Sequence, residues 1–205
     1  MNAELGLRER KKQRTRETIA RAAHALFAER GYHATTLNDI AQAADVSTRT
    51  IFSYFASKED ILFSDFPLMR HALAQALADR PEGEDTLETV RKFILASRKP
   101  ETSELDEQLH FCITNDDTLR SHLRARIAQL EELTAPAIAE DLGAPANDPR
   151  PQIVAASLTA AFNALADHSE SSAGKPKSPE EFAARINPVI TFLRGGLEAL
   201  KDPRT

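Results

Sequence analysis

Residues 31–62 read GYHATTLNDIAQAADVSTRTIFSYFASKEDIL, and this stretch carries three signals for the start of a helix. Thr36, Ser47 and Ser57 each precede a short run with apolar residues at helical spacing. Serine and threonine are favoured at such N-cap positions because their hydroxyl oxygens accept hydrogen bonds from the first, otherwise unpaired amides of a helix. Asp45 stands between the first two runs, and aspartate is one of the few non-glycine residues that tolerate a left-handed backbone. The stretch therefore predicts two short helices joined by a tight turn, and the beginning of a third.

A longer helix is predicted over residues 7–30, directly before this stretch. Its apolar side chains follow the helical period and form one stripe, composed of Ile19, Ala23, Leu26 and Phe27. Gly31 follows the last turn, where glycine commonly ends a helix. Together the three helices of residues 7–55 have the proportions of a helix-turn-helix unit, in which a short last helix lies in the major groove of DNA.

The helix predicted from Ser47 to about Phe55 has two faces. Its apolar side chains form an inward face made of Ile51, Phe52 and Phe55. The polar side chains left to point outward are Thr48, Arg49, Thr50, Ser53 and Tyr54. Their donors and acceptors suit base edges and phosphates, but an ordinary solvated helix face fits the periodicity equally well.

The remainder of the chain also reads as helical, so we expect an all-α fold of about nine helices. A helix that begins at Ser57 contains Pro67, which predicts a kink or break near Asp65.

The final helix, from Ser178, is apolar on two sides, and its Gly195-Gly196 pair would admit a close partner backbone. A homodimer that pairs through the last two helices explains this pattern. Burial of both sides within one chain is the alternative.

Charge is distributed unevenly along the 205 residues. Of the 26 Lys/Arg and 31 Asp/Glu, residues 1–55 hold nine and six, so the other 150 residues hold 17 and 25. Residues 1–55 therefore carry a net positive charge and the rest of the chain a net negative charge. This distribution suits a protein that binds a polyanion through its N-terminal segment. The run of basic residues in the first helix either extends such a contact or is simply solvated: Arg8, Arg10, Lys11, Lys12, Arg14 and Arg16.

Several other classes of protein find no support in the sequence. A single cysteine, Cys112, excludes an internal disulfide, and no His or Cys residues stand at metal-ligand spacing. Neither a nucleophile elbow nor a phosphate-binding glycine loop is present, so we expect no enzyme, no cofactor and no metal. The charged N-terminus and the lack of a long apolar run predict a soluble, cytoplasmic protein without a membrane partner.

The whole of residues 31–62, preceded by Leu26-Phe27-Ala28-Glu29-Arg30, closely resembles the DNA-binding signature of the tetracycline-repressor (TetR) family. The resemblance implies a helix-turn-helix DNA-binding domain over residues 1–56 and a larger helical ligand-binding and dimerisation domain over 57–205. The DNA-contacting side chains that it implies are Thr36, Ser47, Thr48, Arg49, Thr50, Ser53, Tyr54 and Lys58. Thr36 and Lys58 would meet phosphates, and Arg49, where the family often has glycine, could select guanine. Phe52 replaces the usual tyrosine, which leaves it a packing role.

The resemblance further implies a repressor that leaves a pseudo-palindromic operator in double-stranded DNA when a small effector binds. The apolar residues available favour a hydrophobic or acyl-like effector. The candidate effector-binding residues are Phe66, Met69, Phe93, Leu109, His110, Cys112, Phe162 and Asn163, and plain core packing is the alternative role for each. Two other functions remain open, namely a DNA-binding regulator without a small-molecule effector and a helical carrier that has lost DNA recognition.

Overall fold

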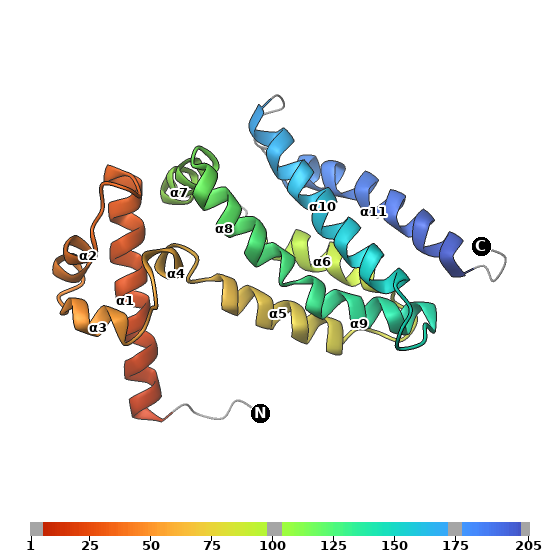
Figure 1. Ribbon diagram of the computed structural model, residues 1–205, viewed down its shortest axis with the longest axis horizontal. Coiled ribbons are helices and arrows are strands. Elements are labelled where there is room, and N and C mark those ends of the chain that lie inside the picture. Colours follow the sequence, from red (N-terminus) through yellow and green to blue (C-terminus); the bar gives the residue numbers. More distant parts are fainter. Residues whose placement is uncertain (1–5, 98–103, 172–177, 202–205) are drawn as a thin grey trace. The chain divides into compact units, whose positions relative to one another are not determined.

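The computed structural model describes residues 6–97, 104–171 and 178–201, and within these ranges the regular structure is entirely helical, in eleven segments (Figure 1). The chain divides into two compact units. The first comprises Met1–Asp65 with Thr102–Leu123, and the second comprises Phe66–Glu101 with Arg124–Thr205. No helix in the described part of the chain is long and apolar enough to cross a membrane.

Helix α1 is the central element of the first unit. The helices of this unit are α1 (Leu7–Arg30), α2 (Leu37–Ala43), α3 (Thr48–Phe52), α4 (Lys58–Leu62) and α7 (Glu104–Thr114), and α8 (Asp117–Ala128) begins in it. The predicted stripe of α1 is its buried face, with Ile19 and Ala23 fully enclosed. Helices α2, α4 and α7 pack against α1, and α3 packs on α2. The predicted three-helix unit is therefore present, with α7 as an additional neighbour.

The predicted helix starts are confirmed by hydrogen bonds. Thr36 accepts from the Asp39 amide and Asp39 accepts from the Thr36 amide, which completes a capping box before α2. Ser47 caps α3 by accepting from the Thr50 amide, and Ser57 caps α4 by accepting from the Asp60 amide. Asp45 has a φ of 53°, the predicted left-handed conformation between α2 and α3.

The second unit is a bundle in which α9 lies along α10 and α11 lies against α6 and α10 (Figure 1). Its helices are α5 (Phe66–Ala78), α6 (Thr86–Ser97), α9 (Glu131–Leu142), α10 (Arg150–Ser171) and α11 (Pro179–Lys201). Its core is made of aliphatic side chains from all five helices, including Leu73, Leu87, Ile138, Leu158 and Leu197. Ser178 caps α11 through the Glu181 amide, as its sequence predicts.

Two of the expected nine helices are each divided in the structure. Residues 63–65 separate α4 from α5, which confirms the break predicted near Asp65. The second division lies between α8 and α9, at residues 129–130, and was not predicted. Pro136 lies inside α9, which continues to Leu142.

Candidate nucleic-acid interface

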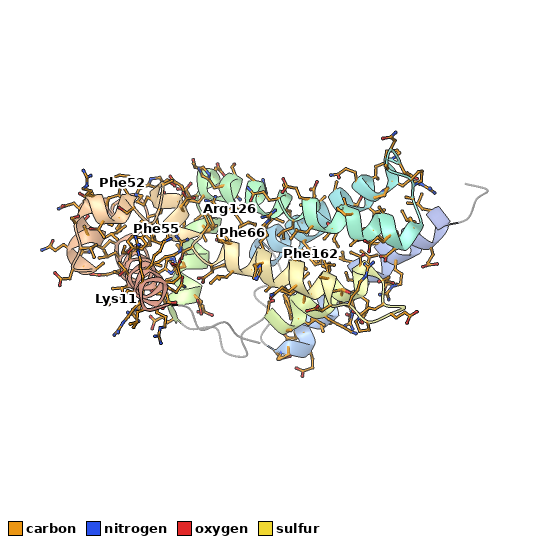
Figure 2. The ribbon with its side chains drawn as sticks, turned by 90° about the horizontal axis from the view of Figure 1, so that it is seen from below. Lys11, Phe52, Phe55, Phe66, Arg126 and Phe162 are labelled. Carbon is orange, nitrogen blue, oxygen red and sulfur yellow. The ribbon has the colours of Figure 1, made fainter. Side chains whose placement is uncertain are left out.

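The outward face of α3 is only partly as predicted. Ile51 and Phe55 are buried, with 1% and 3% of their surface exposed. Phe52 is 58% exposed, so the prediction that it belongs to the inward face and serves packing was wrong (Figure 2). The reason is geometric, since successive helical residues are separated by about 100° and a residue next to Ile51 turns away from the core. Phe52 therefore joins the exposed face.

Hydroxyl groups on α3 are engaged in local hydrogen bonds. The Ser47 Oγ accepts from the Thr50 amide at 3.0 Å and lies 2.8 Å from the Thr50 Oγ1. The Ser53 hydroxyl donates to the Arg49 carbonyl at 3.1 Å. Arg49 itself is exposed, and its guanidinium makes no hydrogen bond or ion pair within the described residues. Arg49 is therefore the long polar side chain on this face that is available for a ligand.

Arg16 of α1 holds the C-terminal end of α3. Its Nη1 donates to the Tyr54 carbonyl at 2.7 Å, and its guanidinium lies 4.2 Å from the centre of the Phe55 ring. Figure 2 shows Phe55 on the side of α3 that faces α1. A cation stacked on an aromatic ring and bonded to a carbonyl fixes both at once. The sequence offered two roles for the basic residues of α1, contact with DNA or exposure to solvent. Arg16 has neither of these as its observed role, because it stabilises the fold around α3.

Lys58 also has partners inside the unit. Its Nζ donates to the carbonyls of Tyr32 and Thr35 at 2.8 and 2.9 Å, and it lies 4.1 Å from the centre of the Tyr32 ring. Partial burial lowers the pKa of the Lys58 ammonium. Lys58 therefore ties the start of α4 to the turn between α1 and α2. An ammonium has three protons, so a phosphate contact in addition to these two bonds stays a prediction.

Thr36 lies at the start of α2 and is exposed, but its hydroxyl donates to Asp39 at 2.6 Å. The hydrogen bonds from Thr36 hold the pKa of the Asp39 carboxyl below its usual value. A carboxylate at this position already satisfies the positive end of the helix. The predicted phosphate contact of Thr36 would have to share that site with Asp39, and it stays a prediction.

The start of α8 is joined to the turn between α1 and α2 by a contact that the sequence did not predict. The His33 Nε2 contacts the Asp116 carboxylate, which also accepts from the Thr118 and Leu119 amides at 2.9 and 3.0 Å. These amide bonds, together with His33, lower the pKa of Asp116. Asp116 is therefore both the cap of α8 and its link to the turn after α1.

The candidate effector residues are divided between the two units. Leu109, His110 and Cys112 lie on α7 in the first unit. Those on α5, α6 and α10 in the second unit are Phe66, Met69, Phe93, Phe162 and Asn163. Phe93 and Phe162 are half-buried and pack against the core of the second unit. Leu109 and Cys112 are half-buried, whereas His110 is exposed. An effector-binding role for either group stays a prediction.

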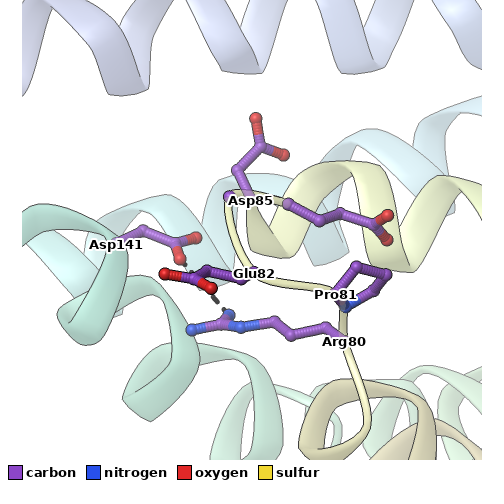
Figure 3. A pocket seen from close by; sticks show the side chains of 7 residues that line it. Arg80, Pro81, Glu82, Asp85 and Asp141 are labelled. Carbon is purple, nitrogen blue, oxygen red and sulfur yellow. Dashed lines mark ion pairs between the residues drawn. The ribbon is translucent and has the colours of Figure 1, made fainter.

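A pocket of about 380 Å³ lies at the turn between α5 and α6, beside α9 (Figure 3). None of the candidate effector residues lines it; its walls are Arg80, Pro81, Glu82, Gly83, Glu84, Asp85 and Asp141. The charges are largely paired with one another or with neighbours, as in Arg80 with Asp141 at 3.3 Å and Asp85 with Arg194 at 3.0 Å. This pocket is open and polar, which does not suit an apolar effector.

The exposed face of α3, its caps and its buried anchors define a helix-turn-helix DNA-binding unit. Comparisons with known proteins agree with this class. Residues 19–64 match the family model described as bacterial regulatory proteins, tetR family, and residues 84–178 match the model described as the MftR C-terminal domain.

Individual relatives extend the likeness beyond the DNA-binding unit. TcmR of Streptomyces glaucescens is 38% identical over 112 residues, which are 53% of this chain and 50% of TcmR. MftR of Mycobacterium tuberculosis is 30% identical over 149 residues, 71% of this chain and 75% of MftR. The structure of Thermus thermophilus FadR in complex with lauroyl-CoA is 26% identical, with a TM-score of 0.55, and the match covers 88% of this chain and 94% of FadR. The chain belongs to the TetR family of transcriptional regulators.

We predict that Arg16→Ala lowers the free energy of unfolding by about 1–2 kcal/mol, because it removes a charge-assisted hydrogen bond and a cation–π contact. Amide hydrogen exchange of residues 47–55 should become faster, and affinity for DNA should fall. The matched control is Arg21→Ala, which removes the same charge from an exposed position on α1 outside the group of basic residues on its first turns. Loss of DNA affinity with unchanged exchange over residues 47–55 would contradict the positioning role.

Proposed function

We propose that this protein is a homodimeric repressor that binds operator DNA through the exposed face of α3 and leaves it when a small apolar effector binds. The observation that supports the DNA-binding role most directly is an exposed Arg49, with no partner for its guanidinium among the described residues, on an α3 anchored by Arg16. An anchored helix presents its side chains in one fixed orientation, which sequence-specific reading of base edges needs.

Basic side chains on the first turns of α1 support a contact with the DNA backbone. Leu7 begins the helix and the buried stripe starts only at Ile19, so these turns have an exposed surface. The exposed cations are Arg8, Arg10, Lys11, Lys12 and Arg14. Phosphate contacts of this kind add affinity without sequence preference and weaken as salt rises. A regulator that binds chromosomal DNA in a bacterium must be in the same compartment as that DNA. The proposal therefore includes the expected cytoplasmic location.

Apolar side chains on α10 and α11 support the homodimer. Ile153 is 58% and Phe192 78% exposed. A Cβ added to Gly195 or Gly196 would meet no atom within 4 Å, so this part of α11 is open to a neighbouring backbone. The two helices lie side by side in Figure 1 and could form a four-helix interface with their counterparts. Two protomers would then hold their α3 helices about 34–36 Å apart, one turn of DNA.

An acyl-like effector is supported by the relatives as well as by the apolar candidates. FadR of Thermus thermophilus is described in complex with lauroyl-CoA, and its match covers most of both chains. The phenylalanines Phe93 and Phe162 contribute apolar surface on the core of the second unit. Such surface suits an acyl chain rather than a charged metabolite.

The DNA-binding role is tested by selecting sequences from random duplex DNA with the purified full-length chain. We predict one enriched, pseudo-palindromic sequence with a guanine in each half-site. Arg49→Ala should lower affinity for it by about 10- to 100-fold and relax the preference at that guanine, because a bidentate contact is lost. The matched control is Lys12→Ala, which should weaken all sequences alike and reduce the salt dependence. If the chain enriches no sequence, the proposal of a DNA-binding regulator fails.

The dimer is tested with Phe192→Asp. A charge placed in an apolar interface should convert the dimer to a monomer, as measured by light scattering after size-exclusion chromatography. Phe111→Asp is the matched control, because Phe111 is a similarly exposed phenylalanine, at 68%, on α7 instead of α11. A Phe192→Asp protein that stays dimeric would show that the last two helices are not the interface.

The effector is tested by thermal unfolding and DNA binding in the presence of lauroyl-CoA, with coenzyme A alone as the control. We predict that lauroyl-CoA raises the melting temperature and releases the DNA, because a ligand stabilises the state it binds. Phe162→Leu should shift the preferred acyl chain to a longer one. Phe182→Leu, also a half-buried phenylalanine packed on the core, should not. If no acyl-CoA of any chain length has an effect, a regulator without such an effector is favoured.

A further inference from the structure

Phe52 is an aromatic side chain exposed on a face that is otherwise polar. It lies four residues after Thr48 and three after Arg49, so all three occupy one side of α3. Phe52 is 58% exposed, and in Figure 2 it lies at the outer edge of the unit. Burial of Ile51 and Phe55 on the opposite side and the Arg16 anchor prevent α3 from rotating to cover it.

The chemistry of a phenyl ring restricts what Phe52 can contact on DNA. It has no donor or acceptor, so it cannot bond a phosphate or the polar edge of a base. The base edges in the major groove present hydrogen-bonding atoms together with one apolar group, the C5-methyl of thymine. If the Phe52 ring enters the major groove beside Arg49, the apolar group that it can contact on the base edges is therefore the C5-methyl of thymine.

We propose that Phe52 determines sequence specificity by packing against the C5-methyl group of a thymine in each operator half-site. The inference rests on the proposed function, in which Arg49 reads a guanine, and adds a second recognised base, the thymine. Side chains three residues apart on a helix have Cβ atoms about 5–6 Å apart, and successive base pairs rise by about 3.4 Å. The thymine therefore lies one or two base pairs from the guanine read by Arg49.

The test replaces thymine by deoxyuridine, which removes only the methyl group, at each position of the selected operator. For the wild-type protein, one replacement per half-site should weaken binding by about fourfold, the value of one buried methyl group. Phe52→Ala should bind the thymine and deoxyuridine operators equally. Because Phe52 is exposed, this variant should keep the wild-type melting temperature, which circular dichroism checks.

Two control variants separate this contact from general loss of affinity. Phe52→Tyr retains the ring and should retain sensitivity to the methyl group. Arg49→Ala should bind more weakly but still discriminate thymine from deoxyuridine. The inference is overturned if no deoxyuridine replacement weakens the wild-type protein, or if Phe52→Ala responds as the wild type does. In both cases the operator is still bound, so the proposed function survives; a chain that enriches no DNA refutes both.

Discussion

The contact of Arg16 with the Tyr54 carbonyl and the Phe55 ring is the interaction on which the rest of the binding surface depends. Helix α3 has five residues, too few to be stable by its own hydrogen bonds. Its Ser47 cap secures one end, and burial of Ile51 and Phe55 secures one side. Arg16 adds a long-range bond from α1, which fixes the other end and so determines which side chains face outward.

Lys58, at the start of α4, also stabilises the unit by binding carbonyl groups and an aromatic ring. Both cations are directed to carbonyl groups and aromatic rings of their own unit, and partial burial lowers the pKa of Lys58. Positive charge in a DNA-binding unit is thus divided between two tasks. Arg16 and Lys58 hold the helices together, while Arg49 and the first turns of α1 remain exposed for a ligand. The number of basic residues in the sequence does not reveal which of them stabilise the fold and which remain exposed.

Local features of this fold could be predicted from the sequence, and contacts between distant residues could not. The caps at Thr36, Ser47 and Ser57 and the buried stripe of α1 involve residues within one or two turns, so their spacing reveals them. The bonds of Arg16 to Tyr54 and of His33 to Asp116 join residues 38 and 83 positions apart, and no periodicity marks them. Phe52 was misassigned because a five-residue helix is too short for periodicity to define its buried face.

Helix α8 crosses the boundary between the two units along the chain. Its first residues belong to the first unit and its last residues to the second, so one continuous hydrogen-bonded element spans the division. Asp116 caps this helix and pairs with His33 in the turn that precedes α2. One carboxylate thus serves both as the cap of α8 and as its contact with that turn. The same turn is held by Lys58 through the Tyr32 and Thr35 carbonyls, so two long-range contacts fix the segment that leads into α2.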